Sequence, residues 1–270
     1  MRDSFEPLHD CAIRESQIMY QEAILFKNSR GDSLSGVLHH PSEARAKGAV
    51  ILCHGMESNK GSNKLVLLGQ ALAERGVLAL RFDFSYVGES SGKFEDITYS
   101  GEVDDLKAAY ALVQSRQTGK TAILGSSMGG SVALLFAAQE PTVAALVTIA
   151  APLHPENFPR RILTPEQMQR WRDRGFTFHN GQRLNATLLE DLERIDVAAS
   201  AQQVSCPVLV LHGDADEVVP VEEARELRDC LASSKHLVIF EGSDHRLSHP
   251  MILRQVISQA LDWLTEHVGK

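Results

Sequence analysis

The chain has 270 residues, of which 43% are hydrophobic and 23% carry charge. These fractions are ordinary for globular proteins, and they exclude disordered and fibrous classes. The formal net charge of −8 at pH 7 disfavours nucleic acids and anionic membrane surfaces as partners, because both bind clustered Lys and Arg.

The sequence has neither a charged leader followed by an apolar stretch nor a long apolar span, so we expect a cytoplasmic protein without membrane contact. No C-x-x-C pair occurs among the four cysteines, which are Cys11, Cys53, Cys206 and Cys230. We therefore expect reduced, mostly buried thiols, no metal site and no cofactor. The length suits a single domain, and a homodimer is compatible with it.

The first part of the chain indicates an extension followed by a hairpin. Residues 1–18 are polar and show no sustained period, which is typical of a loosely held terminus. Two strand-like runs within residues 20–41 then flank Arg30-Gly31-Asp32, where glycine permits a tight turn. We expect an antiparallel hairpin at the edge of a sheet.

From residue 49 onward, short apolar runs alternate with amphipathic stretches. The runs expected to form buried strands are 49–53, 77–84, 121–124, 143–149, 207–211 and 236–240. The stretches expected to form helices are 64–75, 102–115, 130–139, 221–231 and 250–267. This repetition predicts a doubly wound, mostly parallel α/β sheet.

Residues 151–206 interrupt the alternation. They contain no buried-strand run, and they carry an Asn180-Gly181 pair between two short strand-like segments. A structureless loop of this length would be unusual in a compact domain. We expect a small lid with a hairpin, inserted into a core of residues 19–150 and 207–270.

The segment TAILGSSMGG places G-x-S-x-G directly after one expected strand and directly before a helix of small residues, with Ser127 at its centre. A sharp strand-to-helix turn projects the serine hydroxyl out of the sheet, and flanking glycines make room for it. The same pattern recurs around Ser90, but a polar turn follows there. The context therefore selects Ser127 as the nucleophile, while a serine in a tight turn is the alternative.

A serine hydroxyl needs a base, and the base needs an orienting acid. HGDADEVVP and EGSDHRLSHP follow two later expected strands, which gives the chain order Ser, Asp, His. For the base we favour His245 over His249, which precedes Pro250 at an expected helix start. For the acid we favour Asp216 from its G-x-x-D-x-x-V-P spacing, and Asp214 remains an alternative.

These motifs resemble the α/β-hydrolase superfamily, and within it small lidded serine esterases such as cinnamoyl/feruloyl esterases and monoglyceride-lipase-like or serine-aminopeptidase-like hydrolases. The resemblance covers roughly residues 23–268. It is carried by His54-Gly55, Arg81-Phe82-Asp83-Phe84, Gly88-Glu89-Ser90, Gly92-Lys93-Phe94, Gly125 to Gly129, His212 to Pro220 and Gly242 to His245. Two features depart from the cinnamoyl esterases: Ser126 precedes the nucleophile, and the lid residues do not align clearly.

An acyl-transfer site also needs hydrogen-bond donors for the oxyanion. The resemblance implies the backbone N–H groups of Met56, in the loop after the expected strand 49–53, and of Met128, next to the nucleophile. The alternative is that His54-Gly55 merely closes a strand. The resemblance also implies that Asp83 supports this loop without being catalytic.

We expect an esterase that cleaves small-molecule carboxylic esters through an acyl-enzyme on Ser127, favouring medium acyl chains or aryl groups. Four lid aromatics are expected to line the pocket: Phe158, Trp171, Phe176 and Phe178. A thioesterase, a peptidase-like amidase or an acyltransferase could use the same triad. A non-catalytic binding protein is the remaining alternative, and it usually lacks a triad residue.

Overall fold

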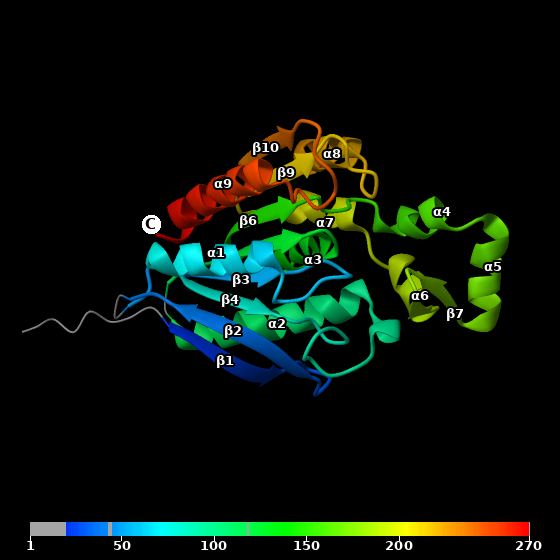
Figure 1. Cartoon of the computed structure of the whole chain (residues 1–270), viewed down its shortest axis with the longest axis horizontal. Coiled ribbons are helices and arrows are strands. Elements are labelled where there is room, and N and C mark those ends of the chain that lie inside the picture. Colours follow the sequence, from blue (N-terminus) through cyan, green and yellow to red (C-terminus); the bar gives the residue numbers. More distant parts are fainter. Residues whose placement is uncertain (1–19, 43–44, 118, 270) are drawn as a thin grey trace, which may run out of the picture.

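The computed structural model describes residues 20–42, 45–117 and 119–269, so the expected extension at 1–18 lies outside the described residues. Its main feature is an eight-stranded sheet with the order β1-β2-β4-β3-β5-β6-β9-β10 (Figure 1). The strands are β1 (Tyr20–Lys27), β2 (Ser33–His40), β3 (Ala49–Cys53), β4 (Leu78–Phe82), β5 (Thr121–Ser126), β6 (Val143–Ile149), β9 (Val208–Gly213) and β10 (Lys235–Phe240). This arrangement confirms the predicted α/β class.

In this sheet, β2 runs antiparallel to both of its neighbours. It pairs with β1 from Tyr20↔His40 to Lys27↔Ser33, and with β4 on its other side. The remaining neighbours pair in parallel. The predicted N-terminal hairpin is therefore confirmed, and Gly31 makes its turn with a φ of 87°.

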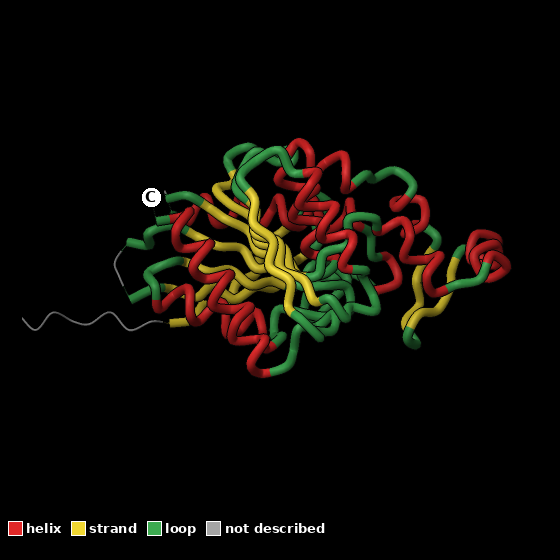
Figure 2. The backbone as a smooth tube through the Cα atoms, turned by 90° about the horizontal axis from the view of Figure 1, so that it is seen from above, coloured by secondary structure: helices red, strands yellow, loops and turns green. Residues whose placement is uncertain are grey.

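Helices cover both faces of the sheet (Figures 1 and 2). One face packs against α1 (Asn63–Glu74) and α9 (Pro250–Val268), and the other against α2 (Tyr99–Arg116), α3 (Met128–Ala137) and α8 (Val221–Cys230). Along β3, Val50 and Leu52 join the α1/α9 cluster, while Ile51 and Cys53 join the other. Burial on both sides explains why the central strands are continuous apolar runs.

The chain reverses its direction of progress across the sheet at β3, because β4 lies on one side of it and β5 on the other. In open α/β sheets, ligands bind at the carboxyl ends of the strands beside such a switch point. The loops that follow β3 and β5 begin at His54 and Ser127. The fold therefore brings two of the sequence motifs to one place.

Residues 150–207, here called the insert, connect β6 to β9 and project from one end of the molecule (Figures 1 and 2). Its elements are η2 (Pro155–Asn157), α4 (Phe158–Ile162), α5 (Pro165–Arg174), β7 (Phe176–His179), β8 (Gln182–Asn185), α6 (Thr187–Leu192) and α7 (Val197–Gln203). The expected hairpin is present: β7 and β8 pair antiparallel, and Asn180 and Gly181 both have positive φ. The rest of the insert is mainly helical.

Among the described residues, no helix is both long and apolar enough to cross a bilayer. Three cysteines are free: Cys53 and Cys206 are buried, and Cys230 is partly buried. Cys11 lies outside the described residues.

Candidate active site

Ser127 lies at the turn between β5 and α3 in a backbone conformation that few non-glycine residues adopt. Its φ is 52° and its ψ is −126°. Positive φ at such a residue costs of order 1–3 kcal/mol and persists where the surrounding structure enforces it. Here the Ser127 N–H donates to the carbonyl of Ile149 at 2.7 Å, and its carbonyl accepts from Gly130 N at 2.8 Å. The strained turn directs the hydroxyl toward the loops at the strand ends.

Glycines on either side of Ser127 allow this turn to pack. A Cβ at Gly125 would lie 2.2 Å from the carbonyl oxygen of Gly129. A Cβ at Gly129 would lie 2.3 Å from the carbonyl oxygen of His54. Real side chains do not approach backbone this closely, so both glycines of the G-x-S-x-G pattern are sterically required.

His245 follows β10 and faces Ser127. Its Nε2 lies 3.0 Å from Ser127 Oγ, within hydrogen-bond distance of the hydroxyl. Its Nδ1 lies 2.8 Å from Asp216 Oδ2, and because an ionised carboxylate only accepts, Nδ1 carries the proton. With the proton on Nδ1, Nε2 is the atom that can accept the proton of the serine hydroxyl. The His245 side chain is 21% exposed, so solvent reaches it from the cavity side.

Asp216 lies in the β9–α8 loop, and its side chain is fully buried. Its Oδ1 accepts the backbone N–H groups of Val218 and Val219, each at 2.8 Å. Besides His245, its Oδ2 has the Nε2 of His212 at 3.2 Å. Burial by itself raises the pKa of Asp216, but the hydrogen bonds from His212, His245 and Val219 outweigh it and hold the pKa well below its ordinary range.

The structure brings together Ser127, Asp216 and His245, and it places the competing residues elsewhere. Ser90 Oγ donates to the carbonyl of Asp83 at 2.6 Å and accepts from Ser35 N at 2.9 Å, so it closes a loop. Asp214 accepts the N–H of Gly242 at 2.6 Å. His249 is the N-cap residue of α9.

Met56 and Met128 line the same cavity as Ser127. Met128 is the first residue of α3, where N–H groups have no acceptor within the helix. The loop that carries Met56 is held by His54, whose Nδ1 donates to Gly55 O at 2.8 Å and whose Nε2 accepts from Phe84 N at 3.1 Å. Burial lowers the pKa of His54, which keeps the ring neutral in this double role.

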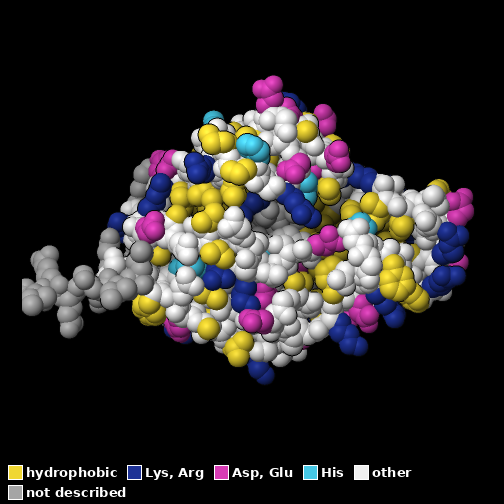
Figure 3. Space-filling view, viewed as in Figure 1, with side chains coloured by type: hydrophobic (Ala, Val, Ile, Leu, Met, Phe, Trp, Pro, Cys, Tyr) yellow, Lys and Arg dark blue, Asp and Glu magenta, His cyan; other side chains and the backbone are white. Residues whose placement is uncertain are grey.

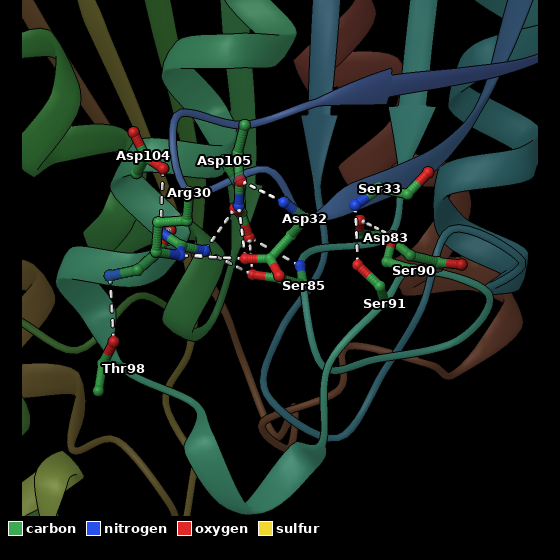
Figure 4. A network of polar contacts seen from close by, with 12 residues as sticks. Arg30, Asp32, Ser33, Asp83, Ser85, Ser90, Ser91, Thr98, Asp104 and Asp105 are labelled. Atoms are coloured by element: carbon green, nitrogen blue, oxygen red, sulfur yellow. Dashed lines mark hydrogen bonds and ion pairs between the residues drawn. The ribbon is translucent and has the colours of Figure 1, made fainter.

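Asp83, at the end of β4, anchors the same loop. Its Oδ1 accepts Lys60 N at 2.7 Å, and its Oδ2 lies 2.5 Å from Lys60 Nζ and accepts Glu89 N at 2.9 Å. Figure 4 shows Asp83 beside Ser90, and a separate group in which a second buried carboxylate, Asp105, accepts Ser85 N at 2.7 Å. These contacts agree with a supporting role for Asp83.

Ser127 and His245 line a cavity of about 820 Å³ between the sheet and the insert, and Asp216 lies buried behind His245. Figure 3 shows the hollow on this face where the insert meets the rest of the molecule. Its apolar wall includes Leu65, Tyr99, Pro152, Phe158, Ile162, Leu188, Leu192, Val219 and Leu253. The tip of the insert's hairpin reaches the loop after β3, where Asn180 Nδ2 donates to Glu57 Oε1 at 2.9 Å. The lining also includes charged side chains, among them Lys64, Arg161, Glu217 and Arg246. A cavity that combines an apolar wall with polar groups suits an organic ligand.

Only Phe158 of the four predicted lid aromatics lines this cavity, at 5.3 Å between ring centres from His179, another lining residue. Trp171 is 1% exposed and belongs to a hydrophobic cluster. Phe176 lies under the guanidinium of Arg183, with 4.2 Å from its centroid to the guanidinium carbon, and Phe178 is 62% exposed. The expectation therefore fails for Trp171, Phe176 and Phe178, because the insert uses them for its own packing or leaves them in solvent.

Sequence reasoning missed several residues of the site. Tyr99 and Lys64, at the starts of α2 and α1, line the cavity, and burial lowers the pKa of Lys64 to about 8. The helical position of Lys64 was predicted, whereas Tyr99 precedes the predicted helix 102–115. Nothing in the sequence spacing indicated the direction of either side chain. His212 begins the motif HGDADEVVP, but no role was predicted for it. Its position directly before Gly213 at the end of a strand could have indicated a place in the site. Among the described residues, no group of three or more His, Cys, Asp or Glu side chains could hold a metal ion.

Two curated relatives match most of the chain. A monoacylglycerol lipase of Mycolicibacterium smegmatis is 24% identical over 254 residues, which cover 82% of this chain and 89% of the relative. The mitochondrial palmitoyl-protein thioesterase ABHD10 of Bos taurus is 26% identical over 215 residues, which cover 75% of this chain and 69% of the relative.

Solved structures agree with the fold. The esterase Est1E from Butyrivibrio proteoclasticus, in a structure with bound ferulic acid, superposes with a TM-score of 0.83 at 25% identity and covers 92% of this chain and 100% of its own. Mouse ABHD10 superposes with a TM-score of 0.78 at 22% identity, covering 91% of this chain and 99% of its own. The model of the family described as serine aminopeptidase, S33, matches residues 44–177 and 181–249. The chain therefore belongs to the S33 serine aminopeptidase family of α/β-hydrolases.

Proposed function

We propose that this protein is a serine esterase that cleaves carboxylic esters with a medium acyl chain or an aryl group. The observation that carries the proposal is the hydrogen-bonded series Ser127, His245 and Asp216 at the strand ends, open to a largely apolar cavity. The names of the relatives, which include an esterase, a lipase and a thioesterase, support acyl transfer as the reaction class.

In the first half-reaction, Ser127 Oγ attacks the ester carbonyl carbon while His245 Nε2 takes its proton. The carbonyl oxygen becomes an oxyanion, which the N–H groups of Met56 and Met128 stabilise. When the bond to the alcohol oxygen breaks, the imidazolium returns the proton to it, and an acyl-enzyme on Ser127 remains. Asp216 stays ionised and holds the Nδ1 proton throughout.

In the second half-reaction, a water molecule takes the place of the alcohol. His245 removes one proton from the water as its oxygen attacks the acyl carbon, and returns it to Ser127 Oγ when the acyl bond breaks. A carboxylic acid leaves, and the free enzyme is restored. The insert acts as a lid in this scheme, because its residues form one wall of the cavity that would hold the acyl chain or the alcohol.

The proposal can be tested with two measurements on the purified protein. A fluorophosphonate probe should label Ser127, located by peptide mass spectrometry, and a panel of p-nitrophenyl esters should show faster hydrolysis of medium chains than of acetate. Thioester and amide substrates of matched acyl length belong in the same panel. If the probe labels Ser127 but no ester is hydrolysed, the esterase assignment is rejected, while the assignment of Ser127 as an activated nucleophile stands.

The low pKa of Asp216 predicts the shape of the pH profile. Because Asp216 stays ionised, it takes up no proton over the acid limb, so log kcat/KM should keep the slope of one that a single catalytic base gives. An aspartate with the ordinary pKa of about 4 would add a second proton and steepen the slope below that pH. Initial rates between about pH 3 and pH 8, at roughly half-unit steps, measure this; a slope that approaches two below pH 4 would contradict the low pKa of Asp216.

Phe158 predicts the acyl-chain preference. Replacing it with alanine removes a large apolar surface from the cavity wall, so kcat/KM for medium-chain esters should fall about 10-fold relative to acetate esters, which corresponds to roughly 1.4 kcal/mol of lost contact. Phe178→Ala is the matched control, since the same insert exposes 62% of that side chain to solvent away from the cavity. Equal chain-length preference in the Phe158→Ala and Phe178→Ala variants would show that the insert does not set it.

A further inference from the structure

His212 is the last residue but one of β9, and its ring is buried beside the triad carboxylate. Neither His212 nor the Asp216 side chain is measurably exposed, at 1% and 0%. Nε2 lies 2.9 Å from the carbonyl oxygen of Val219 and 3.2 Å from Asp216 Oδ2. Both partners only accept, so Nε2 must carry the proton.

The opposite edge of the ring bears on its tautomer. Nδ1 of His212 is buried and has no hydrogen-bond partner among the described residues. A proton on Nδ1 would therefore be an unsatisfied buried donor on a charged ring, which is costly. The contacts therefore favour one tautomer, with the N–H on Nε2 directed to the β9–α8 loop.

We propose that His212 is a positioning residue for the triad: its Nε2–H fixes the Asp216 carboxylate and the Val219 peptide that caps it, and so sets the basicity of His245. The three residues contact one another in a closed set. Val219 N donates to Asp216 Oδ1, Val219 O accepts from His212 Nε2, and His212 Nε2 also lies 3.2 Å from Asp216 Oδ2. Asp216 Oδ2 then lies between two imidazoles, of which only His245 reaches the serine. This inference rests on the triad of the proposed function.

The effect on basicity has a defined sign. A carboxylate that shares its charge with His212 attracts the Nδ1 proton of His245 less strongly than one that does not. Removing the His212 N–H should therefore favour the protonated form of His245 and move the acid limb of kcat/KM to higher pH. The other ionisable groups of the two loops are Asp214, Glu217, Glu241, Asp244, Arg246 and His249. Among the described residues, Asp216 is the one ionisable group at ion-pair distance from His212.

The central experiment compares His212→Phe, which keeps a planar ring without the N–H, with His212→Gln, whose amide can donate at the position of Nε2. The Phe variant should lose about 10-fold in kcat with a smaller change in KM, and its acid limb should rise by roughly half a pH unit, the shift expected from one weak hydrogen bond. The Gln variant should recover most of both changes.

Thr148→Val is the matched control, because it removes a buried polar atom that does not contact Asp216. Thr148, on the neighbouring strand β6, is fully buried, and its Oγ1 has no partner among the described residues. This isosteric change should leave kcat and the pH profile unchanged. If His212→Phe does not fold, His212→Met replaces it in the comparison with His212→Gln.

If the acid limb of the kcat/KM profile does not move in His212→Phe or in its replacement His212→Met, the proposal is overturned, whether or not kcat falls. A loss of kcat in His212→Phe that is equally large in His212→Gln overturns the proposal as well. NMR titration of the His245 imidazole in the wild type and in the donor-free variant reads the same shift without any substrate. Failure of the proposed esterase function would therefore appear as a wild type without ester hydrolysis, separately from the His212 result.

Discussion

Replacing Ser127 with alanine should lower kcat by about 10⁴- to 10⁶-fold, because the members of a triad act as a unit and no other group can form the acyl-enzyme. Folding should be nearly unaffected. The residue lies partly exposed at the elbow, and alanine at the same positive φ adds no side-chain clash. Single-turnover kinetics and a thermal melt of the same preparation measure both effects.

Ser90→Ala is the control, because Ser90 is the centre of the second G-x-S-x-G match. Its hydroxyl joins the Asp83 carbonyl to Ser35 N, so its loss should cost about 1–2 kcal/mol of unfolding free energy with activity retained. Ser127→Ala should therefore lose turnover and keep its stability, whereas Ser90→Ala should lose stability and keep its turnover. An inactive Ser90→Ala with an active Ser127→Ala would refute the assignment.

Replacing Asp216 with asparagine should lower kcat by roughly 10⁴-fold, as expected when the histidine is driven into the wrong tautomer. Asp216 accepts four N–H groups on two oxygens, and an asparagine has one acceptor oxygen and an NH₂ group that would face N–H donors. The His245 ring can restore a hydrogen bond by moving its proton to Nε2, where it no longer accepts from the serine.

Asp214→Asn tests the competing acid on the same loop. Asp214 only accepts the N–H of Gly242, and the carbonyl of asparagine can do the same, so kcat should stay within a factor of about two. Steady-state kinetics of both variants at one pH decide between them. A larger loss at Asp214 than at Asp216 would reverse the assignment of the acid.

The amino-acid sequence by itself determined the architecture and the order of the chemical groups. Buried parallel strands are continuous apolar runs and helices repeat every 3.6 residues, so both appear in local windows. The strand 143–149 matches β6 residue for residue. Ser127 could be chosen over Ser90 because a nucleophile elbow needs a strand before it and a helix after it, and this context is also local.

The tertiary structure decided what depends on side-chain direction across long sequence separations. The apolar stripe of α2 was predictable, but Glu102 and Asp105 on the same helix are buried as well, and burial raises the pKa of Glu102. The sequence spacing of the insert's aromatics could not show which one faces the cavity, because that depends on how α4, α5 and the hairpin pack together.

His212 shows the same limit within a recognised motif. The sequence placed it one residue before a glycine at a strand end, yet its partners are a carboxylate four residues later and a carbonyl seven residues later, in a loop that turns back over the strand. Periodicity reports which face a residue occupies, but the partner of a buried polar atom is fixed only when the loop closes on it.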